Sequence, residues 1–156
     1  MILAAGRGAR MRPLTDTCPK PLLEVHGRPL MEWPMQALYD KGFKRLVINT
    51  AWLGELIESR FGDWAASRPG ASLTFSHERR DFGNALETAG GISRALPMLG
   101  EVFWILAGDV YAPGFAFEPG DVQRFFASND LAHLWLVPNP AHNPRGDFGQ
   151  IGRAHV

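Results

Sequence analysis

Apolar residues along the chain fall either into short continuous runs or into helical spacings. The short runs predict strands at 2–5, 45–49, 73–75, 102–107 and 131–137. The helical spacings predict helices over 28–41, 53–61 and 88–96, followed by the helix stops Gly42, Gly62 and Pro97. The run at 102–107 is uninterrupted, which is typical of a strand buried on both faces. Strands that alternate with helices predict the α/β class: a doubly wound, mainly parallel sheet with helices on both faces.

The loops that follow the strands are the expected ligand site. In open α/β sheets, ligands bind beyond the carboxyl ends of the strands. This rule selects the loops after Ala5, Asn49, Phe75 and Ala107.

The first of these loops contains two glycines, Gly6 and Gly8. Glycine lets backbone N–H groups approach a phosphate closely, although a plain turn explains two spaced glycines equally well. A dinucleotide-binding fingerprint is excluded because Met11 occupies the place of its third small residue, and Pro13 interrupts a helix there. A P-loop is excluded because no Gly-Lys pair is followed by Ser or Thr.

Charge is distributed unevenly along a chain of ordinary globular composition. The 156 residues are 46% hydrophobic and 21% charged, as expected of one domain with a sizeable core. The net charge of +0 argues against nucleic acid as a partner. In the first 20 positions Asp16 is the one acid, and the cationic residues are Arg7, Arg10, Arg12 and Lys20. This segment either handles anions or is a solvated basic loop.

Lys20 and Asp109 are the candidates for phosphate and metal chemistry. Pro19 and Pro21 are expected to hold the segment around Lys20 extended, so that its side chain reaches a phosphate; an exposed lysine in a proline turn is the alternative. Asp109 follows Gly108 at the end of a predicted strand, where a carboxylate is well placed to hold Mg²⁺. A turn or helix-capping aspartate is the alternative.

Several of these segments together resemble one family. The sequence LAAGRGARMRPLT at 3–15, followed by PKP at 19–21, resembles the opening signature of the sugar-1-phosphate nucleotidyltransferases. The pair at 108–109 resembles their metal-binding aspartate, and ETAGG at 87–91 resembles their second nucleotide motif. The resemblance implies an enzyme that transfers a nucleoside monophosphate from a nucleoside triphosphate to a sugar 1-phosphate and releases pyrophosphate.

Two further segments narrow the resemblance. Residues 47–54 and 146–148 are most similar to family members that use UTP and N-acetylmuramate 1-phosphate in peptidoglycan recycling. Guanylyltransferases for mannose 1-phosphate and thymidylyl- or uridylyltransferases for glucose 1-phosphate are the alternatives within the family. Outside it, the alternatives are a nucleotide-binding fragment without catalysis and a generic doubly wound binding protein.

The resemblance also implies roles for individual residues. Arg10 would bind the leaving pyrophosphate, Lys20 the α-phosphate, and Asp109 the Mg²⁺ ion. The residues expected near the nucleotide are Ala4, Ala5, Gly6, Gly8, Glu78, Thr88 and Gly90. Asn139 and Gly149 would face the sugar phosphate. In-line attack by a sugar phosphate oxygen requires no general base, so positioning and electrostatics are expected to supply most of the rate.

The extent of the chain bears on these expectations. Family members are longer and supply a late aspartate that shares the metal. Residues 1–150 are therefore expected to form a nucleotidyltransferase domain that is incomplete at its carboxyl end, with 151–156 an atypical tail. A cytoplasmic location is expected because Cys18 is the single cysteine and no apolar run is long enough to span a bilayer. The expected partners are the nucleoside triphosphate and the sugar 1-phosphate, without nucleic acid or membrane; the oligomeric state is open.

Overall fold

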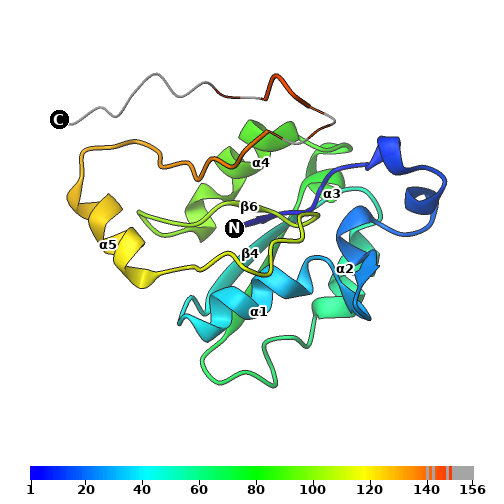
Figure 1. The fold of residues 1–156 in the computed structure, drawn as a ribbon. Helices are drawn as coiled ribbons and strands as arrows, with labels where there is room; N and C mark the ends of the chain where they lie inside the picture. The colour runs from blue at the N-terminus through cyan, green and yellow to red at the C-terminus, as the bar shows by residue number, and fades with distance from the viewer. Residues whose placement is uncertain (140, 142, 147, 149–156) are drawn as a thin grey trace.

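Four parallel strands form the main sheet of the computed structural model, which describes residues 1–139, 141, 143–146 and 148 (Figure 1). In the order β5-β4-β1-β6 across the sheet, they span Ser72–His77, Arg45–Thr50, Ile2–Leu3 and Leu106–Ala107. Ile2 lies opposite Ile48 on one side and Leu106 on the other, which fixes the register. A separate antiparallel pair joins β2 (Glu24–Val25) to β3 (Arg28–Pro29).

Helices and short turns connect the strands. The α-helices are α1 (Glu32–Asp40), α2 (Gly54–Phe61), α3 (Glu78–Phe82), α4 (Glu87–Ala95) and α5 (Pro119–Ala127). Single 3-10 turns lie at Ala9–Met11, Leu14–Asp16, Lys20–Leu22 and Leu96–Met98.

Alternate side chains of β4 are buried on opposite faces of the sheet, as the period of a strand requires. Leu46 and Ile48 join the larger core, which contains Met35 of α1 and apolar residues of α2. Val47 packs instead with Ala95 of α4. Helices therefore cover both faces, with α1 and α2 on one side and α4 on the other, as Figure 1 shows. The predicted doubly wound parallel sheet is confirmed.

The chain order creates a switch point between β1 and β6. From β1 the chain passes through α1 to β4 and through α2 to β5, and it then returns to β6 on the far side of β1. The connections from β1 to β4 and from β4 to β5 contain α1 and α2 on one face of the sheet, and the return from β5 to β6 contains α4 on the other face. In such sheets the crevice outside the carboxyl ends of the two strands at the switch point is where ligands bind.

The strand predicted at 102–107 is much shorter than expected. Only Leu106 and Ala107 pair with β1, and β6 is the outermost strand of the sheet in the described part of the chain. Ile105 is 43% exposed, so the expected burial on both faces is wrong. A strand with a single neighbour has nothing to pair with its free edge or to cover its outer side chains.

The strand expected at 131–137 is absent, so that prediction is wrong. These residues have no regular structure and are exposed. Within the residues that the structure describes, no strand pairs with them, and a strand without a neighbour leaves its backbone groups to water.

Prolines lie at three further places where the structure can be compared with the expected elements. The helix predicted from residue 28 begins at Glu32, because Arg28 and Pro29 pair in β3. Lys20 is not extended; it begins a 3-10 turn, in which the fixed φ of Pro21 is tolerated. The predicted stop at Pro97 is confirmed, since α4 gives way to a 3-10 turn that contains this proline.

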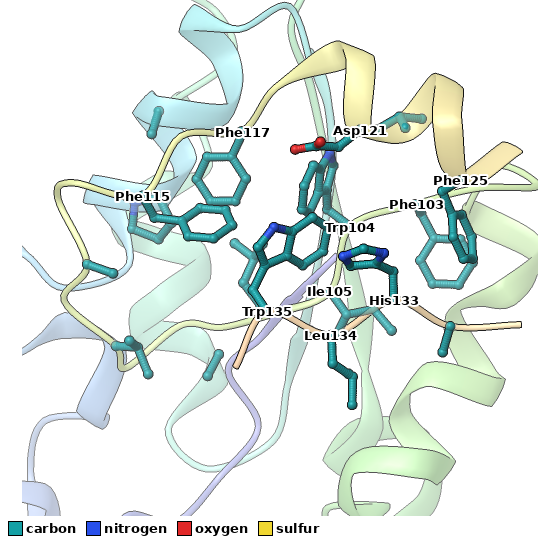
Figure 2. A pocket seen from close by; sticks show the side chains of 18 of the residues that line it. Phe103, Trp104, Ile105, Phe115, Phe117, Asp121, Phe125, His133, Leu134 and Trp135 are labelled. Atoms are coloured by element: carbon teal, nitrogen blue, oxygen red, sulfur yellow. The ribbon is translucent and has the colours of Figure 1, made fainter. Parts of the chain in front are cut away.

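Aromatic side chains gather around an open cavity of about 860 Å³ beside β6 and α5. Figure 2 shows Trp104 and Trp135 facing one another there; their ring centroids are 4.7 Å apart. Phe117 lies edge-on to Trp104 at a centroid distance of 5.3 Å. The apolar residues that precede β6 do not pair with a strand, and ring packing partly buries them instead.

Candidate active site

A second cavity, of about 500 Å³, opens at the carboxyl ends of β1, β4 and β6. It is bounded by the loop after β1, the end of β4, the turn before α4 and the residues around the end of β6. Its lining residues are Leu3, Ala4, Ala5, Gly6, Arg7, Gly8, Ala9, Arg10, Met11, Lys20, Pro21, Asn49, Ala85, Glu87, Thr88, Ala107 and Asp109. The cavity therefore lies at the switch point of the sheet, as the strand-end rule predicts.

Gly8 shapes the loop that follows β1. Its φ is +64°, in the left-handed region that favours glycine. A Cβ atom here would lie 3.0 Å from Cγ2 of Thr15, whose hydroxyl donates a 2.9 Å hydrogen bond to the Gly8 carbonyl oxygen. Both the backbone conformation and the lack of space require glycine at this position. At Gly6 an added Cβ would meet no atom within 4 Å, so the space beside that backbone is open to a ligand.

Arg7 connects this loop to Thr15 and Asp16 through hydrogen bonds. Its guanidinium donates to the Thr15 carbonyl oxygen at 2.7 Å and to Oδ1 of Asp16 at 2.6 Å. The same group lies 3.7 Å from the ring centroid of Trp52, whose Nε1 donates to the Thr15 carbonyl oxygen at 3.0 Å. The hydrogen bond from Arg7 holds the pKa of Asp16 below its usual value. The sequence indicated Arg7 only as part of a basic segment and gave no sign of its contact with Trp52.

Lys20 and Asp109 meet at the cavity although 89 residues separate them in sequence. Nζ of Lys20 donates to Oδ2 of Asp109 at 2.6 Å, and the two side chains are 27% and 32% exposed. Arg10 is exposed at the same cavity and has no hydrogen-bonding or ionic partner among the described residues. The lining thus contains two paired cations, Arg7 and Lys20, and Arg10, which is unpaired in the described part of the chain.

Asp109 can serve as a ligand for a divalent cation, although it does not belong to a preformed cluster. Among the residues described, no group of three or more His, Cys, Asp or Glu side chains could hold a metal ion. Mg²⁺ is commonly held by one or two carboxylates together with substrate phosphates and water, so one partly exposed carboxylate at the cavity fits it. Oδ2 of Asp109 is already occupied by Lys20, which a cation at that oxygen would displace.

The turn before α4 forms the wall opposite the glycine loop. Thr88 lines the cavity but does not cap the helix, because Leu86 is the N-cap residue and no side chain caps it. Glu87 has a φ of +59°. A residue other than glycine pays about 1 kcal/mol or more for this conformation, which persists only where surrounding contacts hold it.

Most residues expected near the nucleotide lie together. Those that line the cavity are Ala4, Ala5, Gly6, Gly8, Arg10, Lys20, Thr88 and Asp109. Gly90, on α4, and Glu78, fully buried in α3, do not line it. Asn139 is exposed outside the cavity and donates to the Pro144 carbonyl oxygen at 3.1 Å. Gly149 and the tail at 151–156 lie outside the described residues. Asn49 lines the cavity without having been predicted; its one signal was a polar residue at the end of an apolar run.

The family of the chain follows from comparison with known proteins. A family model described as "Nucleotidyl transferase" matches residues 1–152. The chain belongs to the nucleotidyl transferase family. The N-acetylmuramate alpha-1-phosphate uridylyltransferase of Neisseria meningitidis serogroup B is 50% identical over 157 residues, which cover 100% of this chain and 66% of that protein. The UTP–glucose-1-phosphate uridylyltransferase of Synechocystis is 38% identical over 117 residues, which cover 70% of this chain and 30% of that protein.

Solved structures support the fold of this nucleotidyl transferase. The crystal structure of HddC from Yersinia pseudotuberculosis complexed with GMP-PN matches with a TM-score of 0.61 at 24% identity, covering 81% of this chain and 51% of that chain. This chain spans 66% of the length of its Neisseria relative. None of the helices in the described residues combines the length and apolarity needed to cross a membrane.

Proposed function

We propose that this nucleotidyl transferase transfers a uridylyl group from UTP to N-acetylmuramate 1-phosphate and releases pyrophosphate. The observation behind this proposal is that Lys20, Asp109 and the glycine loop surround one cavity at the carboxyl edge of a parallel sheet. The choice of base and sugar rests on the name of the Neisseria relative, with 50% identity over the full chain. Peptidoglycan recycling in the cytoplasm is the proposed setting.

The lining of the cavity suits the transfer of a uridylyl group from one anion to another. Gly6 and Gly8 leave backbone N–H groups accessible to phosphate oxygens. Arg10 would offset the charge of the departing pyrophosphate, and Lys20 would offset the charge on the α-phosphate. An oxygen of the sugar phosphate attacks the α-phosphorus, and the bond from that phosphorus to the pyrophosphate oxygen breaks. Because the attacking oxygen is already anionic, the chain supplies position and charge rather than a general base.

Asp109 would hold Mg²⁺ in this reaction. The bound ion supplies positive charge that lowers the repulsion between the two substrates. Lys20 would then exchange Oδ2 of Asp109 for an oxygen of the α-phosphate, so that neither charged group is left without a partner.

Pyrophosphate release by the purified 156-residue chain tests this function. UTP with N-acetylmuramate 1-phosphate is compared with UTP plus glucose 1-phosphate and with GTP plus mannose 1-phosphate, each with and without Mg²⁺. Release with the first pair alone, dependent on Mg²⁺, is expected. Release with only another pair would assign a different substrate, and the Asp109→Asn variant should lose the Mg²⁺-dependent rate in either case.

Nucleotide binding without turnover is the second candidate function. It is favoured by Asn139, a residue expected at the sugar phosphate, which lies away from the cavity in this structure. Calorimetry with UTP distinguishes the two candidates. Saturable binding without pyrophosphate release with any substrate pair would support the second candidate, whereas turnover would exclude it.

A further inference from the structure

Glu78 is a buried carboxylate that lies behind the cavity wall. It is 0% exposed, does not line the cavity, and has no lysine or arginine partner among the described residues. Its two oxygens are both used by neutral donors. Oε1 accepts a 2.7 Å hydrogen bond from Nδ2 of Asn49, and Oε2 accepts a 2.7 Å hydrogen bond from the backbone N–H of Leu86. Burying such a group is costly unless its hydrogen bonds are satisfied, so these two contacts are needed to keep Glu78 in this position.

Asn49 extends this connection to the opposite wall of the cavity. Its Oδ1 accepts a 2.8 Å hydrogen bond from the backbone N–H of Ala4, where the loop after β1 begins. Ala4 and Leu86 thus donate from the two walls, and the side chains of Asn49 and Glu78 bridge them. Ala4 and Asn49 line the cavity directly, and Leu86 lies between the lining residues Ala85 and Glu87.

Two features of the backbone show that this bridge is tightly fitted. A Cβ atom at Gly91 would lie 2.4 Å from Oε1 of Glu78 and 2.8 Å from Nδ2 of Asn49, so glycine is needed for α4 to pack on the pair. Glu87, directly after the anchored Leu86, keeps a φ of +59°. Strained residues of this kind persist where neighbouring contacts over-determine them, and the bond from Glu78 to Leu86 is such a contact.

We propose that Asn49 and Glu78 are positioning residues, which hold the glycine loop and the start of α4 at the spacing that the nucleotide requires. The inference rests on the proposed function, because it assumes that a nucleotide occupies this cavity. Neither side chain takes part in the chemistry; they act through the backbone of Ala4 and of Leu86.

An exchange of hydrogen-bonding groups tests the proposal. In Glu78→Gln, a single side-chain oxygen remains to accept from both Asn49 and Leu86, and the new NH₂ group faces whichever donor is left. In Asn49→Asp, two carboxylates face each other. The double variant restores the complete pattern: residue 49 accepts from Ala4 and from the new amide at 78, and residue 78 still accepts from Leu86. The dissociation constant for UTP should rise about tenfold or more in each single variant and return to within about threefold of the starting chain in the double variant.

Matched measurements separate positioning from a loss of folding. The changes Asn129→Asp and Glu55→Gln are chemically the same, at exposed residues that do not line the cavity, and should leave UTP binding unchanged. Thermal melting must show that every variant is folded at the temperature of the binding assay, and amide exchange at Ala4 and Leu86 should be faster in the single variants only. Single variants that bind UTP normally, or a double variant no better than the singles, would overturn the inference while leaving the function intact. Absence of UTP binding by the unaltered chain would instead overturn the proposed function.

Discussion

Replacing Lys20 by Gln should weaken nucleotide binding far more than it weakens the fold. The change removes the 2.6 Å contact from Nζ to Oδ2 of Asp109. Both side chains are about one-third exposed, and ion pairs in such settings contribute about 0–1 kcal/mol to the free energy of unfolding. For a chain of this size, that corresponds to a fall in Tm of less than about 4 °C.

The loss in binding follows from the charge that Lys20 offers to the triphosphate. A hydrogen bond to a charged group contributes about 1.5–3 kcal/mol, so the dissociation constant for UTP should rise about ten- to hundredfold. If the chain turns over, kcat should fall by about a hundredfold or more, as when one donor to a developing charge is removed. Calorimetry, a thermal melt and the pyrophosphate assay measure the three quantities.

Lys41 provides the matched control for this experiment. Its Nζ contacts Oε1 of Glu118 at the same 2.6 Å, and neither residue lines the cavity that contains Lys20. Lys41→Gln should therefore change Tm by a similar small amount and leave UTP binding unchanged. Equal losses of UTP binding in both variants, or normal binding by the Lys20 variant, would refute the reasoning.

Three further predictions follow from local geometry. Gly8→Ala should raise the UTP dissociation constant and lower the free energy of unfolding by about 1 kcal/mol or more, because φ is +64° and Thr15 lies 3.0 Å from the new Cβ. The control is Gly114→Ala, where the new Cβ meets no atom within 4 Å. Equal effects of the two variants in calorimetry and in thermal melting would contradict the prediction. Gly91→Ala should displace the side chain of Glu78, because the new Cβ would lie 2.4 Å from its Oε1. Unchanged UTP binding together with unchanged amide exchange at Leu86 would contradict this prediction. Burial lowers the pKa of the Met1 amino group from 8.0 to about 6, so between these values the unfolded chain binds more protons than the folded chain. The free energy of unfolding should therefore rise with pH through this window by on the order of 2 kcal/mol; acetylation of the amine should remove the rise, and identical pH profiles of both forms in melting experiments would contradict the prediction.

Part of the candidate site could be predicted because it depends on short segments. The glycine at position 8, the carboxylate after β6 and the cations of the first 20 residues are local in sequence, and the strand-end rule places their loops at one edge of the sheet. The contact of Lys20 with Asp109 could not be predicted, since it depends on how far each loop travels after its strand. Arg7 illustrates the same limit: its charge was visible in the sequence, but its stacking on Trp52 requires two loops to meet.

The sequence by itself determined the alternation of strands and helices, the class of the sheet and the edge at which a ligand is expected. These properties follow from the period of apolar residues and from glycines and prolines that act on their own neighbours. Only the tertiary structure decided that β6 pairs over two residues, that 131–137 forms no strand, and that Asn49 and Glu78 bridge the walls of the cavity. Strand pairing and buried hydrogen bonds need a partner from a distant part of the chain, and the identity and position of that partner are set by packing rather than by local pattern.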